Sequence, residues 1–262
     1  MTETIRIDHD ERGVATLTLD RTEKHNALSA IMIGELTGAA KHLGANPSVR
    51  VVVLTGAGES FCAGGDLDWM RQQMTATRAE RIEQARHLAH MLRALNEMPK
   101  PLIGRIQGQA FGGGVGMMSV CDCAIGVEDA RFGLTETRLG LIPATIAPYV
   151  LARMGEGPAR RVFMSGQRFD AARARELGLL ARVVPPGALN DAVEAEVAPY
   201  LSASPAAVAA AKALARSLGP PINEAVMEQT IERLADTWET PDAAEGVAAF
   251  FEHRKPVWSG LT

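Results

Sequence analysis

The sequence lacks the long apolar runs and the targeting signals that would place a protein in a membrane or outside the cell. No apolar run in its 262 residues approaches the roughly 20 that a membrane-spanning helix needs. Residues 1–4 form neither a basic nor an apolar stretch, so they predict no export signal. We therefore expect a cytoplasmic protein with no membrane partner.

Cysteine is scarce, and positive charge is not in excess. The three cysteines are Cys62, Cys121 and Cys123, an odd number that suggests reduced thiols in a cytoplasm. No His/Cys partner pair has zinc spacing, so we expect no metal site and interpret Cys121 and Cys123 as core thiols. The net charge of −4 argues against a general nucleic-acid binder.

The chain has 47% hydrophobic residues, enough for a substantial core in one large domain or in one domain with an appendage. Strand-like and helix-like segments alternate up to about Val184 and predict an α/β fold. Everything after Pro185 and Pro186 reads as helix, with segments at 189–202, 206–218, 222–240 and 243–252. This shift suggests a core followed by a helical extension.

Three consecutive glycines, residues 112–114, lie between a strand-like run at 101–106 and a helix-like run from Met117. Such a run indicates that another group closely approaches the backbone. If a helix begins near Gly113, its first N–H groups lack partners within the helix and favour an anion, or a transition-state oxyanion. The same sequence also fits a tight packing turn without a ligand.

A second glycine-rich loop, 56–67, follows the apolar run 51–55, which is typical of a buried parallel strand. Two such loops can each offer a backbone N–H to one oxygen. Their sequences, FCAGGDL at 61–67 and QAFGGG at 109–114, resemble the two oxyanion loops of the enoyl-CoA hydratase/isomerase (crotonase) superfamily. The resemblance covers nearly the whole chain, and two such loops in this order and at this separation are a specific signal.

The resemblance implies a crotonase-like spiral of ββα units with a helical C-terminal region. It divides the chain into an α/β core at 1–185 and a helical trimerisation region at 186–262. A homotrimer or a dimer of trimers is then expected. The implied substrate is an acyl-CoA thioester, and coenzyme A is part of that substrate, so we expect no separate cofactor and no nucleic-acid partner.

The resemblance also implies roles for individual residues. Glu136 matches a catalytic glutamate, and we assign the backbone N–H groups of Ala63 and Gly113 as oxyanion donors. Contacts to coenzyme A or substrate are expected from four segments: Lys24, His25 and Ala27; Ala63, Gly64, Gly65, Asp66 and Leu67; Gly113; and, from an adjacent subunit, Phe250 and Lys255. The sequence equally allows Lys24 and Lys255 to be solvated surface charges and Phe250 to be a packing residue.

One position departs from the family pattern. Hydratases of the family often carry a second glutamate one helical turn after the middle glycine, where this chain has Gly116. Glu136 stands among apolar neighbours, which raise the pKa of a carboxyl group. Because Gly116 replaces the second glutamate, Glu136 would either make both proton transfers of hydration through one water, or act as the single acid/base of a double-bond isomerase.

The stretches 66–70 and 139–148 look most like bacterial methylglutaconyl-CoA hydratases of leucine and terpenoid breakdown, some of which also have a small residue at the position of Gly116. We therefore expect an enoyl-CoA hydratase acting on a branched acyl group. Gly116 is then either a lost acid or, as we favour on this hypothesis, a position that leaves room for the substrate. Arg138 is a weak candidate partner for a distal carboxylate, and the sequence favours a surface charge at this position. The isomerase remains an alternative. A non-catalytic scaffold or RNA-binding member is disfavoured by the charge and by an intact Glu136.

Overall fold

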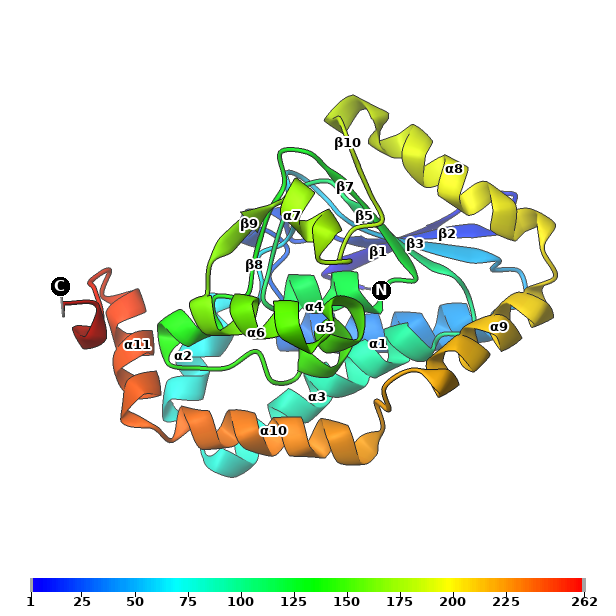
Figure 1. Cartoon of the computed structure of the whole chain (residues 1–262). Coiled ribbons are helices and arrows are strands. Elements are labelled where there is room, and N and C mark those ends of the chain that lie inside the picture. The colour runs from blue at the N-terminus through cyan, green and yellow to red at the C-terminus, as the bar shows by residue number, and fades with distance from the viewer. Residues whose placement is uncertain (1, 261–262) are drawn as a thin grey trace.

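The computed structural model describes residues 2–260 and consists of two sheets surrounded by helices (Figure 1). The larger sheet has the strand order β1-β2-β3-β5-β7-β10, and the smaller one has the order β4-β6-β8-β9. The strands are β1 (Ile5–His9), β2 (Val14–Leu19), β3 (Val51–Gly56), β4 (Ser60–Cys62), β5 (Leu102–Ile106), β6 (Gln109–Phe111), β7 (Cys123–Val127), β8 (Arg131–Gly133), β9 (Arg168–Asp170) and β10 (Arg182–Val184). This α/β arrangement, with its helical C-terminal region, confirms the predicted fold class.

The helices lie between and after these strands. They are α1 (Ala30–Ala45), α2 (Leu67–Thr75), α3 (Arg78–Glu97), α4 (Gly113–Val120), α5 (Ala147–Met154), α6 (Glu156–Ser165), α7 (Ala171–Glu176), α8 (Leu189–Ser202), α9 (Pro205–Leu218), α10 (Glu224–Trp238) and α11 (Pro241–Phe251). Short 3-10 turns include η2 (Glu136–Leu139). Among residues 2–260, no helix is long and apolar enough to cross a membrane.

The large sheet begins with a hairpin and continues as a parallel sheet. β1 and β2 pair antiparallel, and β2, β3, β5, β7 and β10 pair in parallel. Every residue of β3 is buried, as expected for an apolar strand inside a parallel sheet. Helix α8 covers one face of this sheet, and α1, α3 and α4 lie on the other (Figure 1).

Side-chain caps fix where the helices begin. Ser29 accepts a hydrogen bond from the Met32 N–H at the start of α1. Thr77 and Glu80 form a capping box at the start of α3. Pro99 and Pro101 follow the end of α3 and lead into β5. The chain therefore returns to the sheet directly before the second glycine-rich loop.

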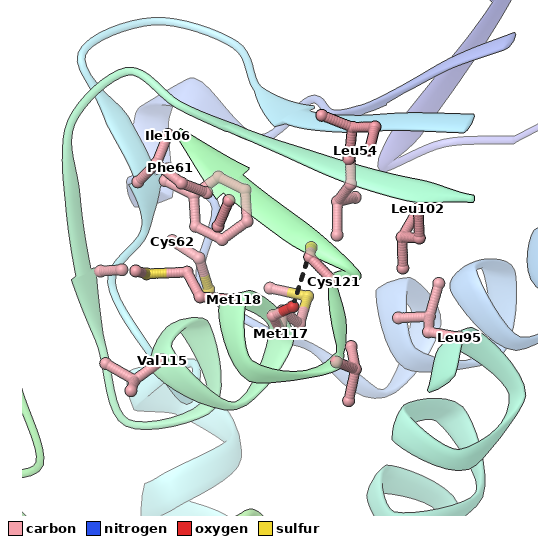
Figure 2. Packing of buried hydrophobic residues seen from close by; sticks show 14 of the residues in the cluster. Leu54, Phe61, Cys62, Leu95, Leu102, Ile106, Val115, Met117, Met118 and Cys121 are labelled. Atoms are coloured by element: carbon pink, nitrogen blue, oxygen red, sulfur yellow. Dashed lines mark hydrogen bonds between the residues drawn. The ribbon is translucent and has the colours of Figure 1, made fainter. Parts of the chain in front are cut away.

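Helix α4 lies in the middle of the core. All of its residues from Gly114 to Val120 are buried, and the side chains of Val115, Met117 and Met118 are surrounded by Phe61, Leu54 and Leu102 (Figure 2). The Cys121 Sγ atom donates to the Met117 carbonyl at 3.3 Å. Burial raises the pKa of Cys62 and of Cys121 to about 12, so both are core thiols. This packing fixes the N-terminus of α4.

The C-terminal helices pack in two ways. Leu189, Val193 and Val197 of α8 belong to the main hydrophobic core. Residues Met227 and Ile231 of α10 pack instead against α3 in a separate cluster. Helix α11 packs on η2, the turn that carries Glu136. The division of the chain at 185/186 stays a prediction from the sequence.

Candidate active site

A largely apolar cavity of about 310 Å³ lies between the two glycine-rich loops, the η2 turn and the C-terminal helices. The loops contribute Ala63, Gly64, Gly65, Leu67, Phe111, Gly112 and Gly113; the 135–146 segment contributes Thr135, Glu136, Leu139, Leu141, Ile142, Pro143, Ala144, Thr145 and Ile146; and the remaining wall is Leu28, Ile33, Trp69, Met70, Leu88, Arg168, Leu234, Trp238 and Phe250. Glu136 and Arg168 are the charged residues of this lining.

The two glycine-rich loops touch each other at one end of the cavity. A side chain at Gly64, whose φ is +99°, would lie 3.1 Å from the Phe111 carbonyl oxygen. A side chain at Gly112, whose φ is +47°, would lie 3.1 Å from Glu136 Oε1. A Cβ at Gly114 would come within 2.5 Å of the Cys62 carbonyl oxygen. The glycines therefore allow a close approach of backbones, as predicted, and Gly112 admits the carboxylate.

Backbone hydrogen bonds in the first loop show which N–H groups are free to bind a ligand. The Ala63 N–H donates to the His25 carbonyl at 3.0 Å. Our prediction that Ala63 is an oxyanion donor is therefore wrong, because its N–H is used within the protein.

The N–H of Gly65, two residues after Ala63, points in a different direction from that of Ala63. The Leu28 N–H donates to the Gly64 carbonyl at 2.8 Å, and the Asp66 N–H donates to the Leu28 carbonyl at 3.1 Å. In this parallel bridge, the N–H of Gly65 points away from Leu28, toward the cavity that Gly65 lines. Gly113 is the first residue of α4, so its N–H has no acceptor within the helix. These two amides border the same cavity.

Glu136 begins the η2 turn and directs its carboxylate to this end of the cavity. The residue as a whole is partly exposed, but its Oε2 atom is buried and has no hydrogen-bond partner among the described residues. Burial raises the pKa of Glu136 to about 7, and a bond to its own backbone N–H opposes the rise. A carboxyl group with this pKa can both accept and donate a proton near neutral pH.

Gly116 faces a side chain rather than the cavity. It lies in the second turn of α4, is buried, and is not among the cavity-lining residues. A Cβ at this position would lie 2.5 Å from Ile146 Cγ2 and 3.0 Å from Ile146 Cβ. Ile146 itself lines the cavity. The hypothesis that Gly116 leaves room for the substrate is therefore corrected: Ile146 fills that room.

The residues expected to hold coenzyme A fall into two groups. Ala63, Gly64, Gly65, Leu67, Gly113 and Phe250 line the cavity, whereas Lys24, His25, Ala27, Asp66 and Lys255 do not. Lys24 and His25 are exposed just before Leu28, and the Lys24 ammonium lies 3.3 Å from the Asp68 carboxylate. Ala27 is buried. Contacts of Lys24, His25 and Ala27 with coenzyme A remain predictions.

Asp66 has a structural role in this chain. It is buried, pairs with Arg21 at 2.9 Å, and accepts hydrogen bonds from the N–H groups of Asp68 and Trp69. These bonds cap α2. The hydrogen bonds and the Arg21 charge lower the pKa of Asp66 although its burial opposes them. Its side chain is therefore engaged in holding the first loop against α2.

The C-terminal tail folds back onto the cavity of its own chain. Phe250, from α11, lines this cavity together with Trp238 from α10, and its side chain remains 44% exposed. The expectation that Phe250 serves the site of an adjacent subunit stays a prediction. Lys255 is exposed and lies outside the lining.

Sequence reasoning missed several residues of the lining. Trp69 and Trp238 come from helices far apart in the sequence, and their only sequence signal is a large aromatic side chain on an otherwise polar helix. Ile146 and Arg168 reach the site through tertiary packing alone. Arg138, proposed from its position near Glu136, is exposed and does not line the cavity. Among residues 2–260, no group of three or more His, Cys, Asp or Glu side chains is placed to hold a metal.

Comparisons with known proteins agree with this architecture. The family model described as enoyl-CoA hydratase/isomerase matches residues 9–261. The crystal structure of an enoyl-CoA hydratase from Shewanella pealeana is 37% identical, covers 98% of this chain and 97% of its own, and superposes with a TM-score of 0.81. An enoyl-CoA hydratase from Mycobacterium avium is 32% identical, covers 98% and 100%, and has a TM-score of 0.85. The 1,2-epoxyphenylacetyl-CoA isomerase of Escherichia coli is 30% identical over 97% of this chain and 98% of its own length.

Proposed function

We propose that this chain, which belongs to the enoyl-CoA hydratase/isomerase family, adds water across the 2,3 double bond of an enoyl-CoA thioester. The observation that carries the proposal is the Glu136 carboxylate, whose Oε2 atom is buried in the same apolar cavity that Gly65 and Gly113 line. Coenzyme A belongs to the substrate, and the chemistry needs only groups of this chain.

The thioester oxygen is polarised by the N–H groups of Gly65 and Gly113. Charge accumulates on this oxygen as water attacks carbon 3, and fixed amide donors stabilise that charge without reorganising. A single donor of this kind contributes about 3–4 kcal/mol to transition-state stabilisation. Helix α4 is embedded in the core, which keeps the Gly113 amide in position (Figure 2).

Glu136 makes both proton transfers. In its ionised form it removes a proton from water while the oxygen of that water bonds to carbon 3. The resulting carboxylic acid then donates the same proton to carbon 2 as the enolate collapses. Its pKa of about 7 suits both steps, because neither form is strongly favoured at neutral pH. No second carboxylate lines the described cavity, so one residue has to serve as base and acid.

A double-bond isomerase is the second candidate, and the same observation supports it. One carboxylate suffices to take a proton from carbon 2 of a 3-enoyl thioester and return it to carbon 4. We favour hydration because segments 66–70 and 139–148 resemble bacterial methylglutaconyl-CoA hydratases. On that resemblance we propose a branched acyl group, such as that of 3-methylglutaconyl-CoA.

The near-ultraviolet absorbance of a conjugated enoyl thioester distinguishes these functions. Hydration of a 2-enoyl-CoA, crotonyl-CoA or 3-methylglutaconyl-CoA, removes the conjugated band. Isomerisation of a 3-enoyl-CoA creates it. We expect loss of the band with wild-type protein and no change with Glu136→Gln. Gain of the band from the 3-enoyl substrate alone would favour the isomerase, and no change with any substrate would favour a non-catalytic member.

A further inference from the structure

Arg168 is an exposed residue at the edge of the apolar cavity, and the proposed chemistry does not use it. Its guanidinium group has no carboxylate within 4 Å among residues 2–260, whereas 11 of the 22 arginines of this chain form such a pair. It lies 5.1 Å from the centroid of the Phe111 ring. Stacking on an aromatic face holds a guanidinium group in place while its N–H groups stay available.

Pairing between three short strands explains why Arg168 reaches the cavity. Phe111 of β6 is opposite Gly133 of β8, and Gly133 is opposite Arg168 of β9. Residues directly opposite each other project from the same face of a sheet. Because Gly133 has no side chain, the Phe111 ring occupies that place, and Arg168 extends over it. Phe111 directly precedes Gly112, which contacts the Glu136 carboxylate.

Arg168 is not a partner of Glu136. The two residues form no ion pair in the structure, and the pKa of Glu136 is set by burial and by its own backbone, without a contribution from Arg168. The positive charge of Arg168 is therefore not neutralised by the catalytic carboxylate. Within the cavity lining it has no other anionic side chain to pair with.

We propose that Arg168 is a specificity-determining residue that binds a second carboxylate at the distal end of a short acyl group, so that the preferred substrates are CoA thioesters of dicarboxylic acids. This inference rests on the proposed function, because it assumes that an acyl-CoA occupies the cavity. A planar guanidinium group binds a carboxylate through two parallel hydrogen bonds. The structure thus assigns to Arg168 the role that the sequence suggested for Arg138.

Binding of saturated thioesters tests the inference without turnover. Glutaryl-CoA carries a distal carboxylate, and butyryl-CoA is a similar short thioester without one. We expect Arg168→Gln to weaken glutaryl-CoA binding by about 10- to 100-fold, the range for a charge-assisted hydrogen bond, and butyryl-CoA binding by less than about 3-fold. Arg168→Lys, which keeps the charge but loses the fork, should lie between wild type and Arg168→Gln.

A matched variant controls for net charge. Arg161 of α6 is exposed near Arg168 but does not line the cavity. Arg161→Gln should leave the dissociation constants of both thioesters, measured by titration calorimetry, within about 3-fold of wild type, because Arg161 does not line the cavity and an exposed charge without direct contact to the ligand is screened.

Three results would overturn the inference. Equal weakening of both thioesters by Arg168→Gln would mean that Arg168 binds the coenzyme A phosphates. No weakening of glutaryl-CoA would remove its role altogether. If wild-type protein bound neither thioester, the proposed function would fail and the inference with it, whereas the first two results leave that function intact.

Discussion

Gly116→Ala tests whether Ile146 fills the space that the glycine opens. The new Cβ would lie 2.5 Å from Ile146 Cγ2 and 3.0 Å from Ile146 Cβ. Rotation of the side chain leaves Ile146 Cβ in place, so only a backbone shift can move this atom. The backbone is held, because the Ile146 carbonyl accepts hydrogen bonds from the N–H groups of Tyr149 and Val150. Overpacking of this kind costs about 1–3 kcal/mol, while replacing glycine by alanine inside a helix gains about 1 kcal/mol. The backbone itself must shift, which places the overpacking cost at about 2–3 kcal/mol, so we expect a net loss of about 1–2 kcal/mol.

Thermal unfolding at one protein concentration measures this loss. Gly38 lies in α1 with nothing within 4 Å of its missing Cβ, so Gly38→Ala is the matched control and should raise stability by about 0.5–1 kcal/mol. Ile146→Ala alone should cost about 2–5 kcal/mol. The stability loss of the Gly116→Ala/Ile146→Ala double variant should be smaller by about 1–2 kcal/mol than the sum of the losses of the two single variants, because the two side chains compete for one volume. A Gly116→Ala protein as stable as wild type would refute the packing argument.

Three further predictions concern the oxyanion donor, the buried carboxyl group and the assembly. Gly113→Pro removes an N–H that Gly113→Ala keeps, and both variants introduce a Cβ 2.6 Å from Leu28 Cδ1. The kcat of Gly113→Pro should be about 100- to 1,000-fold lower than that of Gly113→Ala, and equal rates would exclude this donor. Burial raises the pKa of Glu136 from 4.5 to about 7, so the unfolded chain loses this proton at lower pH than the folded protein. As the pH rises from 4.5 to 7, the free energy of unfolding of wild type should therefore fall relative to that of Glu136→Gln, by up to about 3 kcal/mol. A difference between the two proteins that does not depend on pH would contradict this. Light scattering should give the mass of a trimer or a dimer of trimers, and a monomer at micromolar concentration would overturn the predicted assembly.

Local signals in the sequence were enough to predict most of the elements. The apolar runs at 51–55 and 101–106 act through the nearby backbone, and the structure has β3 and β5 at these positions. The glycines at 112–114 also correctly predicted that other groups approach the backbone closely at these positions. The glycines could not predict which groups approach, because Glu136, Leu28 and Cys62 come from elsewhere in the chain.

The misassigned site residues share one cause, which is contact between distant segments. Ala63 lost its proposed role because its N–H meets the carbonyl of His25, 38 positions earlier in the sequence. Gly116 was interpreted as open space because Ile146 approaches it only in the folded core. Arg168 enters the cavity through the antiparallel pairing of β9 with β8, two short strands that the sequence did not predict.

The central claim is that Glu136 alone carries the proton transfers. The most direct test is the pH dependence of kcat/KM for wild type and for Glu136→Gln on an enoyl-CoA substrate, with the fold of the variant checked by circular dichroism. In the hydration direction the base must be ionised, so wild-type kcat/KM should rise with pH to a plateau above about 7, the pKa to which burial raises Glu136. Glu136→Gln should lose at least about 100-fold and show no rise in this range. A folded Glu136→Gln protein with near-normal kcat/KM and the wild-type pH profile would contradict the account.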